Sequence, residues 1–96
     1  MPYRHIVLFR VRAGVDERDV EGAIDRLRGL AGLPGVAAWR VERSLDTRKG
    51  TVIAEEAEFA DRATYEAFRA HPLHQQVADE LSRIADWWGG GDYVTD

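Results

Sequence analysis

The sequence contains no cysteine, few prolines and no long apolar segment. Without cysteine the chain can form neither a disulfide framework nor a thiolate metal site. No apolar run approaches the roughly 20 residues that a membrane helix requires, so we predict no membrane association. Acidic residues outnumber basic ones by 17 to 13. A nucleic-acid-binding domain would instead carry a basic stripe, so we predict no nucleic-acid partner.

The length of 96 residues fits one domain, spanning residues 1–96. A chain of this size buries only about 60–70% of the surface that its unfolded form exposes, so its own core is thin. Because disulfides and thiolate metal sites are excluded, a partner subunit is the expected source of further burial. The first residues lead straight into a strand pattern without a signal-peptide profile, which predicts a cytoplasmic protein.

The spacing of apolar residues divides the chain into four strands and three helices. The predicted strands cover residues 5–11, 36–45 and 51–59, with a last strand inside 86–94. The predicted helices cover 16–31, with Asp16 as N-cap, a short segment capped by Asp61, and a segment that begins at Pro72. Glycines 89–91 leave two alternatives: the last strand begins late, near Asp92, or the glycines leave room beside the sheet.

This order of elements predicts a ferredoxin-like α+β subunit, βαββαβ, with a four-stranded antiparallel sheet and helices on one face. The first strand is apolar on both faces, with Val7 and Phe9 on one side and Ile6 and Leu8 on the other. A strand with one solvated face would alternate apolar and polar residues. We therefore predict a homodimer joined through its sheet faces, a dimeric α+β barrel.

Five short segments carry a family resemblance, and they are His5-Ile6-Val7-Leu8-Phe9, Pro34-Gly35-Val36, Phe59, His71-Pro72-Leu73-His74 and Asp92-Tyr93. Together they resemble the stress-responsive A/B barrel (Dabb) domain family in order and spacing over nearly the whole chain. The resemblance implies a ferredoxin-like subunit, a dimer joined through its sheets, and a cavity between sheet and helices.

The family includes a plant polyketide cyclase that makes olivetolic acid by a cofactor-free aldol step, with a histidine base beside a tyrosine. The base matches His74, and the first-strand histidine of the cyclase matches His5. The tyrosine of the cyclase falls on Phe68, while Tyr65, one turn earlier on the same face, is not the matching residue. The resemblance thus implies cofactor-free acid–base chemistry at His74 and departs from the cyclase at Phe68.

Histidine exchanges a proton near neutral pH, so His74 is the first catalytic candidate, as a base for a proton alpha to a carbonyl. The alternative is that His74 caps or packs the third helix through a bond to a backbone carbonyl. His5 is the second candidate, with backbone hydrogen bonding as its alternative. Glu55 lies in an otherwise largely apolar row, and we predict that its carboxylate reaches water or an arginine.

Other chemistries find little support. His71 is predicted to be exposed, and Pro72 separates it from His74, so no metal site is expected. Ser44 and Ser82 lack a nucleophile motif, and no helix follows Gly89–Gly91 to form a phosphate loop. We therefore expect no cofactor and no bound metal.

The predicted pocket is lined by residues for which ordinary core packing is the alternative: Val7, Phe9, Leu27, Tyr65, Phe68, Val77 and Trp88. Its expected ligand is a small hydrophobic or aromatic, polyketide-like molecule. Three functions remain open: a cyclase-type enzyme with His74 as base, a non-catalytic stress-protective dimer, and a cofactor-free monooxygenase like others in the dimeric α+β barrel superfamily.

Overall fold

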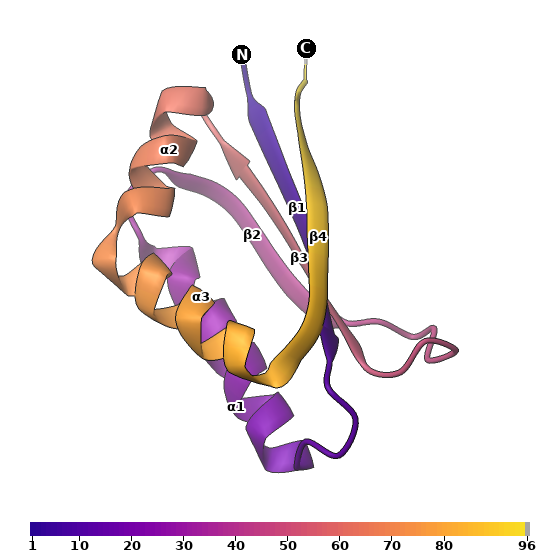
Figure 1. Cartoon of the computed structure of the whole chain (residues 1–96). Helices are drawn as coiled ribbons and strands as arrows, with labels where there is room; N and C mark the ends of the chain where they lie inside the picture. The colour runs from indigo at the N-terminus through magenta and orange to yellow at the C-terminus, as the bar shows by residue number, and fades with distance from the viewer. Residues whose placement is uncertain (96) are drawn as a thin grey trace.

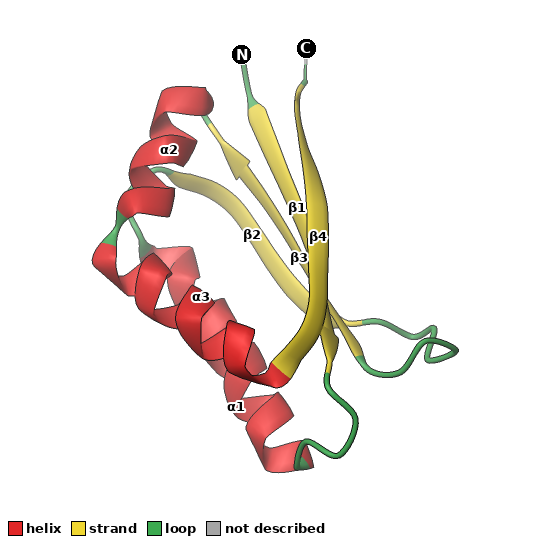
Figure 2. Cartoon of the chain, in the orientation of Figure 1, coloured by secondary structure: helices red, strands yellow, loops and turns green. Residues whose placement is uncertain are grey.

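A computed structural model describes residues 1–95 of the chain. The elements follow the order β1, α1, a 3-10 helix η1, β2, β3, α2, α3, β4 (Figures 1 and 2). The strands are β1 (Tyr3–Val11), β2 (Val36–Arg43), β3 (Val52–Phe59) and β4 (Ala85–Val94). The helices are α1 (Glu17–Arg28), η1 (Gly29–Gly32), α2 (Arg62–Ala70) and α3 (Pro72–Ile84). The predicted ferredoxin-like α+β order is confirmed.

The four strands form one sheet in the order β2-β3-β1-β4, and all neighbouring pairs are antiparallel. All three helices lie on one face of this sheet, as Figure 2 shows. Strands β1 and β4 are neighbours along their whole length, and beyond their ends the Thr95 N–H donates to the Pro2 carbonyl at 2.9 Å (Figure 1). The first and last strands of the chain therefore lie side by side.

The helix boundaries follow their capping residues. Asp16 accepts a hydrogen bond from the Arg18 backbone N–H at 2.8 Å, and Asp61 accepts one from Thr64 at 2.8 Å. The helix predicted over 16–31 ends earlier, at Arg28, because the chain tightens into the 3-10 turn Gly29–Gly32. Strands β2 and β3 are likewise shorter than predicted, by two residues and one residue, because the connecting loop takes those residues.

The core lies between the helices and the inner sheet face. Phe59 and Ile53 of β3 are completely buried, and Val77 and Leu81 of α3 are 1% exposed. Burying side chains of this size stabilises the fold by about 1.5–3 kcal/mol each. The Trp39 indole on β2 also donates a hydrogen bond to the Leu27 carbonyl of α1 at 3.1 Å. Helix α1 is thereby held against the sheet by both packing and a directed bond.

Strand β4 begins at Ala85, so the three glycines lie inside the strand and pair with β1. Of the two alternatives, the late start near Asp92 is wrong. A side chain at Gly90 would place its Cβ 2.0 Å from the Ile6 carbonyl oxygen, so only glycine fits this close approach of the two backbones. Trp88, predicted to line the pocket, belongs to β4 opposite Phe9.

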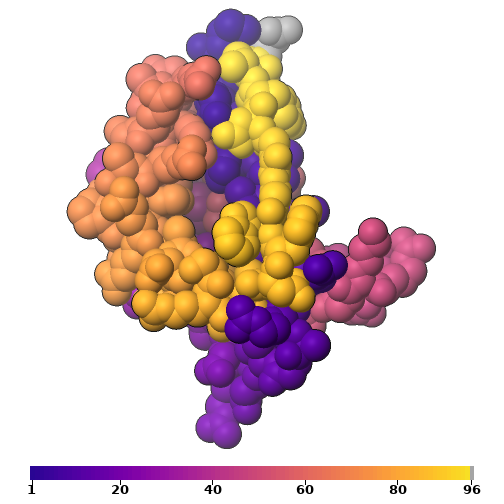
Figure 3. All heavy atoms as spheres, in the orientation of Figure 1, coloured from indigo at the N-terminus to yellow at the C-terminus, as the bar shows by residue number. Residues whose placement is uncertain are grey.

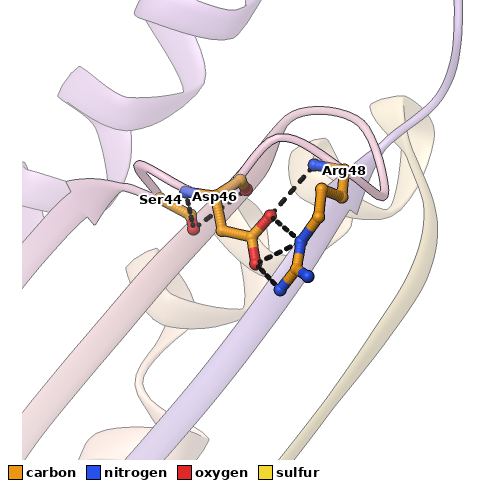
Figure 4. A network of polar contacts seen from close by, with 3 residues as sticks. All are labelled: Ser44, Asp46 and Arg48. Carbon is orange, nitrogen blue, oxygen red and sulfur yellow. Dashed lines mark hydrogen bonds and ion pairs between the residues drawn. The ribbon is translucent and has the colours of Figure 1, made fainter.

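The loop between β2 and β3 is held by hydrogen bonds and ion pairs among its own residues. The Asp46 carboxylate accepts bonds from the backbone and guanidinium of Arg48, and Ser44 Oγ bonds the Asp46 backbone (Figure 4). Ser44 therefore serves the loop, in agreement with its lack of a nucleophile motif.

Candidate active site

A pocket of about 490 Å³ lies between the sheet and the two C-terminal helices. Figure 3 shows it as an opening between the yellow atoms of β4 and the orange atoms of α2 and α3, with indigo atoms of β1 in its depth. The glycines of β4 form part of its wall. The absence of side chains in this stretch leaves the space open, so the second alternative for the glycine run is the one that the structure shows.

His5 lies at the strand side of the pocket between two carboxylates. Its Nδ1 is 2.6 Å from Asp92 Oδ1 and its Nε2 is 3.3 Å from Glu55 Oε2. The sheet register produces this arrangement, because Asp92 on β4 is directly opposite His5 on β1 and Glu55 on β3 is two residues from the partner of His5. With a carboxylate at each ring nitrogen, His5 is suited to the doubly protonated form.

The hydrogen bonds of this cluster shift several pKa values. Burial lowers the pKa of His5, but its bonds to Glu55 and Asp92 outweigh burial and raise it overall. Burial raises the pKa of Asp92, yet bonds from Tyr3 and His5 lower it overall. Burial and the bond from its hydroxyl to Asp92, 2.5 Å long, raise the pKa of Tyr3 to about 12. His5 is thus stabilised as a cation, and Tyr3 as a neutral donor.

Aromatic rings surround the cluster. The Tyr65 ring on α2 stacks on Tyr3 with centroids 4.7 Å apart and packs against His5 at 4.8 Å. Burial, together with the charge of Asp92, raises the pKa of Tyr65. The hydroxyl of Tyr65 consequently stays protonated at neutral pH.

His74 lies in the first turn of α3, on the helix side of the same pocket. Its ring packs edge-on against Phe68 with centroids 4.9 Å apart. Its Nδ1 is buried and has no hydrogen-bond partner among residues 1–95. Burial lowers the pKa of His74, and the nearby charge of Glu55 opposes this only in part. His74 is therefore a neutral imidazole at neutral pH, the form that accepts a proton.

The cap of α3 comes from His71, not from His74. His71 Nδ1 accepts a hydrogen bond from the Leu73 backbone N–H at 3.1 Å, and the residue is half-buried. The prediction that His71 is exposed is wrong, because its ring folds back over the helix start. His74 does not cap α3, and the contact of its ring with the Arg69 backbone at the end of α2 raises the pKa only as a cause smaller than burial.

Glu55 corrects another expectation. The carboxylate was predicted to reach water or an arginine, but the residue is 3% exposed and bonds His5. Two polar residues on the inner faces of adjacent strands were a usable signal, because buried charges need partners. That signal predicts a contact between His5 and Glu55. The contact between His5 and Asp92, which are 87 positions apart in the sequence, could be predicted only from the register of β4.

The predicted lining residues divide into two groups. Val7, Phe9, Tyr65 and Trp88 lie around the pocket together with His5 and His74. The other three do not line it and belong to the packed core, because their side chains face neighbouring helices and strands: Leu27, Phe68 and Val77. Sequence reasoning also missed three polar residues at the pocket or its cluster: Tyr3, Arg69 and Asp92.

Within residues 1–95 no group of three or more histidine, aspartate or glutamate side chains is arranged to hold a metal ion. In the same part of the chain, none of the helices combines the length and apolarity needed to cross a membrane. The chemistry available in the pocket is that of two histidines, two carboxylates, one tyrosine, one arginine and one serine, with Tyr3 bonded to one of the carboxylates from outside the lining.

Residues 3–94 match the family described as the Stress responsive A/B Barrel Domain, Dabb. The chain belongs to this family. None of the curated proteins matches the sequence. Several solved structures have the same fold, and each of the three below matches this chain over almost its whole length.

A dimeric ferredoxin-like protein from Thermobifida fusca has a TM-score of 0.88 at 23% identity, covering 99% of this chain and 92% of its own. A hydroxynitrile lyase from Passiflora edulis has a TM-score of 0.86 at 21% identity, covering 99% and 94%. A Dabb family protein from Mesorhizobium loti has a TM-score of 0.82 at 24% identity, covering 98% and 96%. The chain is a Dabb protein of the dimeric α+β barrel fold, and its structural relatives include dimers.

Proposed function

We propose that this Dabb protein is a homodimer whose pocket binds a small hydrophobic or aromatic carbonyl compound and performs cofactor-free acid–base chemistry on it. The observation that carries the proposal is the presence of two histidines in one pocket with pKa values shifted in opposite directions. Pairs of titratable groups separated in this way take the roles of acid and base.

In the proposed reaction the neutral imidazole of His74 removes a proton alpha to the carbonyl. The C–H electron pair forms a C=C bond while the carbonyl π pair moves onto oxygen, which gives an enolate, and His74 becomes an imidazolium. The enolate carbon then bonds a second carbonyl carbon of the ligand, and that oxygen takes the proton back from His74. His5 donates a hydrogen bond from Nε2–H to the enolate oxygen and stabilises its negative charge. The distance of 3.3 Å between Nε2 and Glu55 Oε2 is long for a hydrogen bond, so this N–H is free to turn to the ligand.

The hydroxynitrile lyase of the same fold supports this class of reaction, since a lyase is carried there on a similar scaffold. Binding without catalysis is the second candidate. Phe68 favours it, because a phenyl ring packs on His74 where a hydroxyl would position a ligand. The two candidates share the pocket and differ in turnover.

The test combines binding and turnover for wild type, His74→Gln and Gln76→Ala, an exposed position on the same helix as a matched control. Ligands that bind the native state raise the melting temperature, so a panel of aromatic acids, polyketide-like lactones and fatty acids identifies the class bound. On that class we expect His74→Gln to lower turnover by about 10²–10⁴-fold, the usual contribution of a general base. Oxygen uptake with anthrone-like phenols is measured in parallel and separates a monooxygenase.

Unchanged turnover in His74→Gln contradicts His74 as the base. A ligand that binds without any turnover supports the binding protein instead.

The outer face of the sheet supports the homodimer. Leu8 is 39% exposed there, and the exposed Trp87 and Tyr93 of β4 are opposite Arg10 and Arg4 on the same face. A charge at this face would lie unpaired in a sheet-to-sheet interface, so we expect Leu8→Asp to produce monomers in sedimentation experiments. Leu45→Asp is the control, because Leu45 is completely exposed in the β2–β3 loop. A Leu8→Asp protein that stays folded and dimeric places the interface elsewhere.

A further inference from the structure

Arg69 lies at the mouth of the pocket. It is near the end of α2 and lines both the pocket and a more open groove of about 650 Å³ on the outside of α2 and α3. His74, Ala78 and Ser82 also line both spaces, so the pocket and the groove adjoin along one side of α3 and at Arg69. A ligand in either space therefore lies beside both Arg69 and His74.

The Arg69 guanidinium contacts the Tyr65 hydroxyl, and it differs from the other arginines in having no carboxylate or carbonyl acceptor within residues 1–95. The chain has 13 basic residues, of which Lys49 is the single lysine. Ten arginines have a carboxylate within 4.0 Å, and Arg12 donates to the Arg83 carbonyl. In the part of the chain that the structure describes, Arg69 is the remaining arginine, with neither a carboxylate nor a carbonyl partner.

The carboxylates around Arg69 are already paired. Glu66 bonds Arg62 at 3.1 Å and Asp79 bonds Arg83 at 2.7 Å, and both line the groove. On the strand side of the pocket, Glu55 and Asp92 flank the His5 ring. The mouth therefore carries one uncompensated positive charge, while the strand side has more acid than base. This gradient orients a ligand with its anionic group outward.

Placement near a helix C-terminus also favours an arginine, because the helix dipole attracts cations there. That effect requires a positive charge in the last turn and nothing more. It does not require the charge to border a pocket or to remain without a carboxylate among many available ones. Binding of an anion accounts for all three observations.

We infer that Arg69 binds the carboxylate of a small aromatic or keto acid, which places the body of that acid between His5 and His74. This inference rests on the proposed function and names its substrate class. Arginine is suited to the task because its planar fork donates two parallel hydrogen bonds to a carboxylate.

The same contact would tune the base. Burial is the main cause of the lowered pKa of His74, and the charge of Arg69 lowers it further. A carboxylate bound to Arg69 offsets that charge, so ligand binding raises the proton affinity of His74. Recognition of the acid and activation of the base are then one event.

The test uses a probe pair of equal shape, 1-naphthoate and 1-naphthamide, in calorimetric titrations of the full chain. We expect naphthoate to bind wild type at least about tenfold more tightly, as a charge-assisted pair provides. Arg69→Gln should abolish this preference, and Arg69→Lys should keep part of it. Arg18→Gln removes an equal charge from an exposed site away from the pocket and should keep all of it. Naphthoate should also raise the His74 pKa, measured by NMR, in wild type but not in Arg69→Gln.

Equal affinity of wild type for the two probes, or a carboxylate preference that persists in Arg69→Gln, overturns the role of Arg69 and leaves the pocket proposal intact. If neither probe binds wild type, the inference and the pocket proposal both fall.

Discussion

Each side of the pocket contains one histidine, and the two surroundings shift the histidine pKa values in opposite directions. On the strand side, both ring nitrogens of His5 face carboxylates, and the Tyr3 hydroxyl bonds one of them in turn. On the helix side, His74 packs against the Phe68 ring and its Nδ1 has no partner within residues 1–95. Both histidines are partly buried, so burial alone does not distinguish them.

The two pKa shifts differ because the two histidines have different hydrogen-bond partners. Loss of water disfavours the charged form of either imidazole, and acceptors at both nitrogens reverse that effect for His5 alone. On the strand side the two carboxylates thus favour the charged form of His5 and fix its orientation beside the pocket. The helix side is a reactive position that keeps a neutral base beside open space.

The largest expected effect comes from exchanging each histidine for glutamine. His5→Gln leaves Glu55, which is 3% exposed, without its cationic partner. We expect a loss of about 3 kcal/mol, typical of an uncompensated buried charge. His74→Gln removes the ring packing on Phe68 but leaves no buried charge unpaired, and it should cost about 1 kcal/mol. Urea unfolding of both variants measures the difference, and equal losses would show that the two sides are not structurally distinct.

A smaller loss is expected for Tyr3→Phe. The substitution keeps the ring stacked on Tyr65 and removes only the hydroxyl that donates to Asp92. We expect the free energy of unfolding to fall by about 1 kcal/mol, the usual net value of one hydrogen bond. The same measurement on Tyr93→Phe, an exposed tyrosine of β4, serves as the control and should show no change. A Tyr3→Phe protein as stable as wild type would remove Tyr3 from the cluster.

The pH dependence of stability should show the two histidines acting in opposite directions. The raised pKa of His5 stabilises the fold below the unfolded value of about 6.5, and this contribution is lost as pH rises through the folded pKa. The lowered pKa of His74 stabilises above about 6.5 and is lost as pH falls through its folded pKa.

Unfolding measured between pH 5 and pH 9 should therefore lose its alkaline decline in His5→Gln. In His74→Gln the same measurement should lose part of the decline below about pH 6.5. An alkaline decline that survives in His5→Gln would mean that another group titrates there.

The smallest expected effect is that of Arg69 on the free protein. Because its charge lowers the pKa of His74 only as a minor cause after burial, Arg69→Gln should raise that pKa slightly. No such change is expected at His5, whose shift comes from burial, Glu55 and Asp92. Imidazole NMR titration of the variant distinguishes the two, and a shift at His5 alone would contradict the placement of Arg69 beside His74.

The fold was predictable because local signals agree along the chain. Caps at Asp16 and Asp61, Pro72 at a helix start and alternating apolar strands each mark an element that the structure contains. The element ends were less predictable, since the 3-10 turn after Arg28 continues the apolar spacing of the helix. The start of β4 was open, because glycine carries no side-chain pattern from which pairing can be inferred.

The site was predictable only in part. His5 and His74 stand out in sequence as histidines beside apolar patterns, and the structure brings both to one pocket. The partners of His5 depend on the register of three strands, and no local signal states that register. Leu27 and Val77 were assigned to the pocket because an apolar stripe does not reveal which part faces the core and which faces a cavity.

The central claim is that one pocket holds a charged and a neutral histidine at the same pH. Heteronuclear NMR titration of the imidazole signals measures both directly, with His5→Gln and His74→Gln to assign them. The account predicts a pKa for His5 above the ordinary value of about 6.5 and a pKa for His74 below it. Two histidines that titrate together near that value, or in the reverse order, would contradict it.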